Sequence, residues 1–152
     1  MSLMEKISEH MKVAMKSRDK LRLETLRTVR AQLLEKQVEK RPAGGMTADD
    51  ELAVLVAASK KRKEAIEIYR SHNRNDIATT EEQELAIIQE YMPKQLSPQE
   101  IEELIRKTIH DVGASSGKDF GKVTPVLMRE LKGKAEGKLV QEMLRKLLGL
   151  EL

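Results

Sequence analysis

Apolar residues recur at three- and four-residue spacing along most of the chain, which is the pattern of amphipathic helices. In the first 93 residues this spacing predicts four helices. The apolar positions that define their faces are, helix by helix, Met4, Ile7, Met11 and Met15; Leu21, Leu26, Val29, Leu33 and Leu34; Leu52, Leu55, Val56, Ile66 and Tyr69; and Leu85, Ile88 and Met92. We expect these helices to form one unit over residues 1–93.

Capping and breaking residues predict where these helices begin and end. The stretch 42–45, Pro-Ala-Gly-Gly, stops the second helix near residue 40, and Thr47 with Asp50 forms a capping box that opens the long third helix. We expect a loop over residues 71–76 and a start of the fourth helix at a second capping box, Thr79 with Glu82. Proline 93 then ends that helix because it lacks an N–H and its φ is fixed.

A second helical unit is predicted over residues 97–152, after a linker at residues 93–96. The stretch 97–100, Ser-Pro-Gln-Glu, is the clearest helix start in the chain, with serine at the N-cap and proline at the first helical position. Three further apolar stripes follow: Ile101, Leu104, Ile105 and Ile109; Phe120, Val123 and Leu127; and Leu139, Val140, Met143, Leu144, Leu147 and Leu148. The fold class is therefore all-α, an N-terminal long-helix hairpin or bundle followed by a three-helix bundle.

The middle helix of this second unit contains a proline. Gly113 ends the helix before it, and Ser116 with Asp119 caps its start. Pro125 removes a hydrogen bond to Gly121 and is expected to kink the helix, although Gly121 lacks a side chain that would add to the crowding.

Composition excludes several classes of protein. Of 152 residues, 35% are charged and only 2% are aromatic, which is typical of a helical protein with polar outer faces. Cysteine is absent, so disulfides, thiolate metal sites and a cysteine-dependent glutaminase are excluded. The N-terminal stretch carries charges at short intervals with no long apolar run. We therefore expect a cytoplasmic protein with no membrane segment.

The net charge of +3 is unevenly distributed. Residues 1–45 hold 11 Lys and Arg against 6 Asp and Glu, and residues 46–96 hold 7 against 10. Residues 115–148 hold 8 against 4, so a second basic region surrounds the sequence Lys-Gly-Lys-Ala-Glu-Gly-Lys at 132–138, here called the basic turn. Such a distribution makes a polyanion the natural partner to consider.

The basic turn directly precedes the last predicted helix. Glycine permits positive φ and close backbone approach, and the lysines add positive charge at a helix N-terminus, which already favours anions. The spacing fits neither a Walker loop nor GxGxxG after a strand, so a mononucleotide site is not supported. The alternative is a glycine-rich helix connection with solvated lysines.

No catalytic or metal-binding constellation is found. His10, His72 and His110 lie in separate elements without metal-ligand spacing, so we expect them on exposed helices or loops. Ser115 and Ser116 lack a nucleophile elbow, and capping explains Ser116. We therefore predict no catalytic residue, metal or cofactor.

Other basic runs are less specific. Lys, Lys, Arg and Lys at residues 60–63 span one helical turn and are expected to be solvated. The cations of the first two helices are compatible with a lined groove; they are Lys12, Lys16, Lys20, Arg22, Arg27 and Arg30. The three aromatic residues, Tyr69, Tyr91 and Phe120, all occupy apolar faces, so base stacking is poorly supported and contacts to phosphate and shape remain.

Five segments, in order along the chain, resemble the YqeY family: residues 1–3, 11–16, 91–97, 113–123 and 131–140. The C-terminal half is also similar to the tail domain of the B subunit of glutamine-dependent aspartyl/glutamyl-tRNA amidotransferase, and to a domain appended to some glutaminyl-tRNA synthetases. In those proteins the tail helps to engage the tRNA body. The chain departs from the family pattern at Thr124-Pro125, where Met-Gly is common, and at Glu136, where Asp is usual.

The resemblance implies a helical unit joined to a tRNA-binding type of tail, with the family label of a carbon–nitrogen ligase that uses glutamine as amide donor. Because no ATP site or glutaminase is recognisable, we expect an accessory protein that binds tRNA and is not catalytic alone, with amidotransferase or tRNA-handling proteins as further partners. The expected nucleic-acid-binding residues are Lys118, Lys122, Lys132, Gly133, Lys134, Gly137 and Lys138. Participation in amide transfer, and a protein–protein adaptor without RNA binding, are the alternatives.

Overall fold

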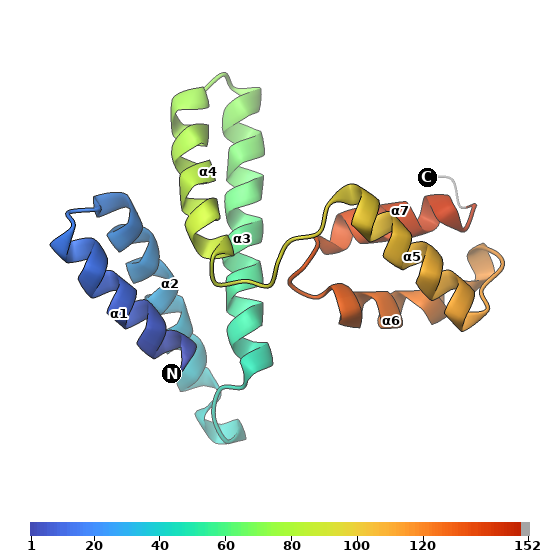
Figure 1. The fold of residues 1–152 in the computed structure, drawn as a ribbon, viewed down its shortest axis with the longest axis horizontal. Coiled ribbons are helices and arrows are strands. Elements are labelled where there is room, and N and C mark those ends of the chain that lie inside the picture. Colours follow the sequence, from blue (N-terminus) through green and yellow to red (C-terminus); the bar gives the residue numbers. More distant parts are fainter. Residues whose placement is uncertain (150–152) are drawn as a thin grey trace. The chain divides into compact units, whose positions relative to one another are not determined.

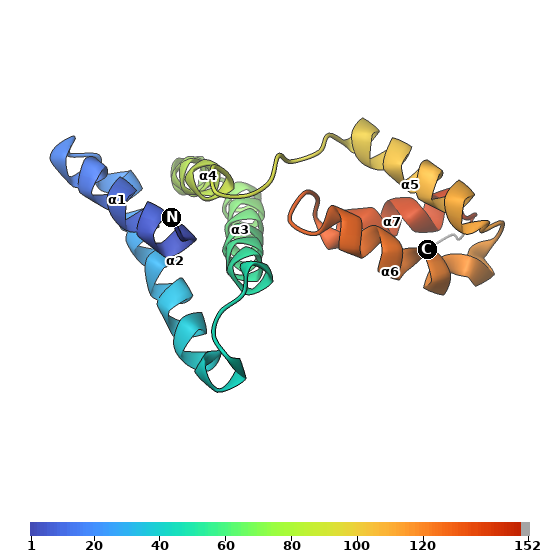
Figure 2. The same ribbon diagram turned by 60° about the horizontal axis from the view of Figure 1, so that its bottom comes forward.

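A computed structural model describes residues 1–149 of the chain, and within that range it contains helices and no strand. The predicted all-α fold class is confirmed. The helices are α1 (Leu3–Lys16), α2 (Lys20–Glu39), α3 (Ala48–Ser71), α4 (Asn75–Gln89), α5 (Pro98–Val112), α6 (Phe120–Leu131) and α7 (Gly137–Leu147), with short 3₁₀ turns η1 (Arg41–Ala43) and η2 (Gly117–Asp119) (Figures 1 and 2). The chain divides into two compact units, Met1–Pro93 and a second that begins at Lys94.

The first unit consists of two antiparallel helix pairs, α1 with α2 and α3 with α4, and α2 packs against both helices of the second pair (Figure 1). Its core residues are Ile7, Leu26, Val29, Leu33, Leu55, Ala58, Ile87 and Ile88. The capping box predicted at Thr47 is confirmed: the Asp50 amide donates to Thr47 Oγ1 at 3.2 Å, and the Thr47 amide donates to the Asp50 carboxylate at 2.9 Å.

The buried stripe of α1 differs from the predicted one by a residue. Met15 was expected to face the core, but it is 59% exposed, and Ala14 is buried instead at 1% exposed. The buried positions Ile7 and Ala14 are two turns apart, a seven-residue repeat that keeps one narrow face toward α2 and rotates Met15 away from it. Leu34 of α2, also predicted to face the core, is 41% exposed.

The predicted start of α4 at Thr79 is wrong, because the helix begins at Asn75. Thr79 lies inside the first turns, where its hydroxyl donates to the Asn75 carbonyl at 2.8 Å. The connection from α3 is shorter than expected because Asn73 adopts a positive φ of 58°, a conformation that asparagine tolerates better than most residues. The chain therefore reverses within three residues.

The end of α4 is held to α1 and α2 by polar contacts. The Tyr91 hydroxyl forms a hydrogen bond with His10 Nδ1, and Arg22 Nη1 lies 2.6 Å from Glu90 Oε2. Burial raises the pKa of the Tyr91 hydroxyl. The expectation that His10 is an exposed helix residue is therefore wrong, because its ring is partly buried against Tyr91.

Arg62 also departs from the prediction of a solvated basic run. Its side chain is only 14% exposed, and Nε lies 2.8 Å from Glu84 Oε2 and 3.5 Å from Glu81 Oε2, so it connects α3 to α4. Burial raises the pKa of the Glu84 carboxyl, an effect that outweighs the attraction of Arg62. Lys60 and Lys61 are exposed, as predicted.

The second unit is a three-helix bundle of α5, α6 and α7 (Figure 1). Its core residues are Ile101, Ile105, Val123, Leu127, Leu131, Val140, Leu144 and Leu148. As predicted, Ser97 caps α5 by accepting from the Glu100 amide at 3.2 Å, and Gly113 ends that helix with a positive φ of 76°.

The helix α6 continues through Pro125 from Phe120 to Leu131. The proline ring is on the exposed side, and Gly121, whose carbonyl loses its usual partner, is also an exposed residue. Val123, Leu127 and Leu131 on the opposite face are buried. The proline therefore leaves the apolar face of α6 in place up to the residue that precedes the basic turn.

Asp119 connects the loop after α5 to the start of α6. Its Oδ2 accepts from the Ser115 amide at 2.9 Å and from the Ser116 amide at 3.4 Å. These two hydrogen bonds, and Lys122 nearby, lower the pKa of the Asp119 carboxyl below its usual value. The predicted box of Ser116 and Asp119 is present, and it caps η2, which leads directly into α6.

The lowered pKa of Asp119 predicts a pH-dependent contribution to stability. Because the carboxylate is favoured in the folded state, the contribution is present above the unfolded pKa of about 4 and is lost as pH falls through the folded pKa. We expect Asp119→Asn to lower the urea midpoint of the second unit at pH 7 and to differ much less from wild type at pH 2.5. An equal gap at both pH values would refute the role of the charge.

Candidate nucleic-acid interface

The basic turn connects two helices whose neighbouring residues are anchored in the core. Leu131 is the last residue of α6 and Val140 lies in the first turn of α7, and both side chains are buried. Between them the backbone leaves the helix at Lys132, with ψ of 121°, and reverses at Gly133, with φ of 77°. The buried residues on either side of the turn therefore determine where its lysines reach the protein surface.

The two glycines of the turn have different roles. Gly133 is buried and has the positive φ that disfavours residues with a side chain. Gly137 is the first residue of α7, and a Cβ built there would lie 2.9 Å from Cε of Met128. Gly133 is thus needed for backbone conformation, whereas Gly137 allows close packing of a flexible methionine.

This difference predicts unequal costs for two alanine substitutions. We expect Gly133→Ala to destabilise the second unit by about 1–2 kcal/mol, because alanine is strained at positive φ. We expect Gly137→Ala to stay within about 1 kcal/mol of wild type, since the end of Met128 can move and alanine favours the helix. Urea unfolding of the two variants measures both values, and equal costs would contradict the assignment.

Part of the backbone of the turn is already hydrogen-bonded. The amides of Lys134 and Ala135 both donate to the Leu131 carbonyl, at 2.9 and 3.2 Å. These two amides are therefore not available for an anion.

The N-terminus of α7 has backbone amides that no side chain caps. Its N-cap residue, Glu136, makes no side-chain cap hydrogen bond, and no acidic residue lies within its first turn. The first amides of a helix have no partner inside the helix, and the helix dipole places partial positive charge there. The amides of residues 137–139 therefore form the anion-favouring part of this site.

Three lysines lie within five residues of the start of α7 in the sequence. Lys132, Lys134 and Lys138 are all exposed. Among residues 1–149 none of the three forms an ion pair. Their charges are therefore not neutralised by neighbouring carboxylates in direct contact.

The linker segment contributes to the site, which the sequence pattern did not predict. Gln95 Nε2 donates to the Gly133 carbonyl at 2.6 Å, and the Leu96 amide donates to the Lys134 carbonyl at 2.9 Å. Leu96 also packs against the core of the second unit. The sequence pattern predicts only a linker here. The one sequence feature that indicates a further role is the resemblance of residues 91–97 to the YqeY family.

Lys118 and Lys122 do not lie with the other predicted site residues. They flank the amino end of α6, whereas the basic turn follows its carboxyl end, and twelve residues at 1.5 Å each separate the ends by about 18 Å. Lys122 Nζ lies 3.7 Å from Asp119 Oδ1. Arg145 of α7 stacks on Phe120 at 4.8 Å, so it belongs to this second basic group and was missed.

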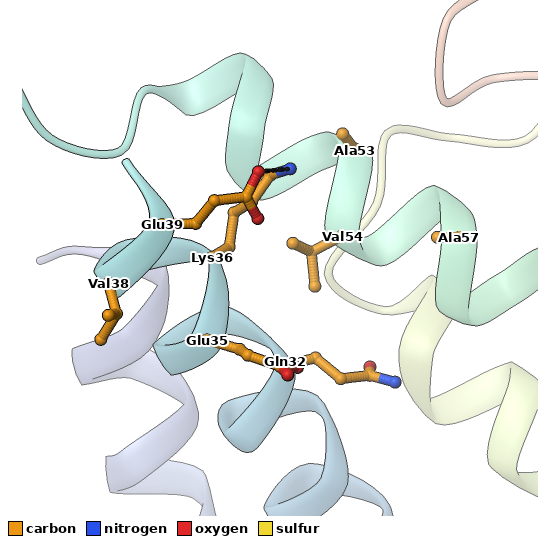
Figure 3. Close-up of a pocket in the computed structure, with 8 residues that line it drawn as sticks. All are labelled: Gln32, Glu35, Lys36, Val38, Glu39, Ala53, Val54 and Ala57. Atoms are coloured by element: carbon orange, nitrogen blue, oxygen red, sulfur yellow. Dashed lines mark ion pairs between the residues drawn. The ribbon is translucent and has the colours of Figure 1, made fainter. Parts of the chain in front are cut away.

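Of the six cations of α1 and α2 considered above, Arg30 lines a hollow of about 630 Å³ together with Glu5 and Glu9, and the arginines are engaged in contacts within this unit. Arg22 contacts Glu90, Arg27 contacts Glu24, and Arg30 donates to Ser8 Oγ at 3.1 Å. Another hollow, of about 440 Å³, lies on this unit between α2 and α3 (Figure 3). Its polar lining includes the ion pair of Lys36 with Glu39, and none of the predicted site residues.

Residues 1–149 contain no group of three or more His, Cys, Asp or Glu side chains arranged to hold a metal ion. Ser116 serves as a helix cap, as expected. Within the same range no helix has the length and apolar character that a membrane span requires.

Comparison with known proteins places the chain in a family. A family model described as Yqey-like protein matches residues 4–148. The chain is 32% identical over 116 residues to altered inheritance of mitochondria protein 41, mitochondrial, of Vanderwaltozyma polyspora, and 28% identical over 134 residues to the protein of the same name of Pyrenophora tritici-repentis. These alignments cover 73% and 86% of this chain, and 60% and 71% of the relatives. With the family model matching nearly its whole length, the chain belongs to the YqeY family.

Proposed function

We propose that this protein is an accessory factor that binds tRNA through the sugar-phosphate backbone and is not catalytic alone. The observation that carries the proposal is that Lys132, Lys134 and Lys138 are exposed, form no ion pair among residues 1–149, and lie within five residues of the uncapped N-terminus of α7. Lysine ammonium groups and helix N-terminal amides both favour phosphate oxygens. Gly133 and Gly137 contribute the shape of the connection rather than contacts.

The contacts of the aromatic residues support recognition of phosphate and shape rather than of bases. Phe120 is covered by Arg145, and Tyr91 is held by His10. Stacking on bases requires accessible aromatic faces. Contacts to phosphate carry no sequence information, so we expect affinity for many tRNAs.

The second basic group extends the proposed contact surface. Lys118 is exposed, and Lys122 and Arg145 lie at the same end of α6. Two groups about 18 Å apart along one helix are able to contact different phosphates of one folded RNA. Because Lys122 pairs with Asp119 and Arg145 with Phe120, we expect this group to contribute less than the basic turn.

The link to glutamine-dependent amidotransferases is also part of this proposal, and it rests on the similarity of the C-terminal half to the amidotransferase tail. In this view the protein assists carbon–nitrogen ligation carried out by another enzyme. The cytoplasmic location stays a prediction, and the names of the two relatives assign those proteins to mitochondria.

A titration of the full chain with total tRNA across a range of salt concentrations tests the proposal. We expect binding at 50 mM salt that weakens steeply by 200 mM, because each neutralised phosphate releases counterions. Absence of binding at the lowest salt would remove the proposal and favour the adaptor alternative. Stimulation of glutaminase activity when the chain is added to an amidotransferase core would test the enzymatic link.

Glu136 provides a separate prediction for the same site. Its exposed carboxylate precedes the N-terminus of α7 and makes no cap hydrogen bond, so it opposes an approaching phosphate. We expect Glu136→Gln to tighten tRNA binding severalfold at low salt and to have little effect at high salt, where charges are screened. Fluorescence anisotropy at the two salt concentrations measures this, and weaker binding by the variant would refute it.

A further inference from the structure

We propose that Gln95 is a positioning residue of the basic turn, and that docking of the linker segment on the turn regulates its affinity for RNA. This inference rests on the proposed function. It adds to that function a residue with no positive charge, located outside the turn and outside every helix.

The contact geometry supports this role. Gln95 and Leu96 are consecutive residues, and they donate to the carbonyls of two consecutive turn residues, Gly133 and Lys134, at 2.6 and 2.9 Å. Each of these carbonyls belongs to a peptide unit next to a lysine of the site. The two hydrogen bonds therefore fix the orientation of the peptide units that follow Gly133 and Lys134.

The two hydrogen bonds within the turn, from the amides of Lys134 and Ala135 to the Leu131 carbonyl, do not involve the Gly133 carbonyl. Gly133 is buried and has positive φ, and its carbonyl needs a partner that the helices do not supply. Without the Gln95 amide this carbonyl must rotate toward water, which also moves Lys132 and Lys134. A lysine that is held in place before binding loses less freedom when it meets a phosphate than a lysine on a mobile turn.

The proposed regulatory element is the segment 94–96, which contains Gln95 and follows directly after the first unit. The residues just before it belong to the first unit, where Glu90 contacts Arg22 and Tyr91 contacts His10. Any event that pulls the segment 94–96 away from the turn breaks both hydrogen bonds together. Binding of RNA and docking of the linker then favour one another, because such coupling is reciprocal.

The main test compares Gln95→Ala with Gln99→Ala, a matched control on the exposed surface of α5. We expect Gln95→Ala to weaken tRNA binding by about five- to tenfold at 50 mM salt, the scale expected for a lost preorganising contact. We expect Gln99→Ala to bind like wild type. Equal affinities of the two variants would overturn the proposal.

A double-mutant cycle separates positioning from general destabilisation. We expect Gln95→Ala and Lys134→Ala to be non-additive, since the lysine contributes less once the turn is loose. We expect Gln95→Ala and Lys118→Ala to be additive, because Lys118 lies at the other end of α6. Additivity in both cycles, or equal non-additivity in both, would overturn the positioning role.

The wild-type protein supplies a readout that needs no variant. Hydrogen exchange of the Leu96 amide is expected to slow when saturating tRNA is added at low salt, because RNA binding favours the docked linker. Unchanged exchange at Leu96 in a protein that binds tRNA would contradict the regulation alone. Failure of the wild type to bind tRNA would instead overturn the proposed function, and this inference with it.

Discussion

Replacing Lys132 and Lys134 together by glutamate is expected to weaken tRNA binding by about a hundredfold at 50 mM salt, and to lower the salt slope by about two. Both side chains are exposed and have no ion pair within residues 1–149, so their reversal does not break a contact of the fold. It replaces two attractions for phosphate by two repulsions. Anisotropy titrations at several salt concentrations give both the affinity and the slope.

The matched control for this change is Lys60→Glu with Lys61→Glu. These lysines are likewise close together in the chain, exposed, and without an ion pair among the described residues, and the net charge changes equally. We expect this control to weaken binding by less than about threefold, since these two lysines are not part of the proposed site. Equal losses in the two double variants would show that only total charge matters.

The largest stability effect is expected from Leu127→Ala. Leu127 is 0% exposed at the centre of the second unit, and truncation of such a leucine costs about 3–5 kcal/mol. A unit of about 60 residues rarely has more than a few kcal/mol of stability. We therefore expect the second unit of this variant to be largely unfolded at 25 °C, with tRNA binding lost.

Hydrogen exchange followed by peptide mass spectrometry on the full chain measures this effect in each unit separately. We expect fast exchange in α5, α6 and α7 and unchanged protection in α2 and α3. The control is Leu139→Ala, because Leu139 is 37% exposed on α7 and its truncation is expected to cost less than about 1 kcal/mol. Loss of protection in both units of Leu127→Ala would show that they unfold together.

The sequence predicts the helical fold well because its main determinants are local. The cap at Ser97, the box of Thr47 with Asp50 and the stop at Gly113 each act through backbone groups within four residues. The errors arise where contacts between helices decide which residues are buried. The face of α1 that packs against α2 decides which of its residues are buried. Ala14 is therefore buried and Met15 exposed, the reverse of the prediction.

The candidate site was predicted in part. The lysines and glycines of the basic turn were identified from composition and spacing. Their grouping was not, because Lys118 and Lys122 are close to the turn in sequence but lie at the other end of α6. Gln95 was missed because a hydrogen bond between residues 38 positions apart leaves no local pattern. Likewise, nothing local marks Arg62 as the residue that pairs with α4.

Substitutions of the partly buried polar residues Arg62 and Gln95 are expected to have different consequences. Arg62 lies between two carboxylates, so its removal leaves Glu81 and Glu84 close together in a partly buried place. Gln95 instead donates to the backbone carbonyl of Gly133 in the basic turn. Substitutions at Arg62 thus report on the fold of the first unit, whereas substitutions at Gln95 report on the turn.

In the proposed complex, tRNA contacts the N-terminus of α7 and the lysines of the basic turn. Backbone amide chemical shifts of the isotope-labelled full chain, followed during titration with tRNA at 50 mM salt, test this most directly. We expect the largest shifts at residues 132–139, including the amides of Gly137, Lys138 and Leu139. Shifts confined to α1, α2 and α3, with residues 132–139 unchanged at saturation, would contradict it.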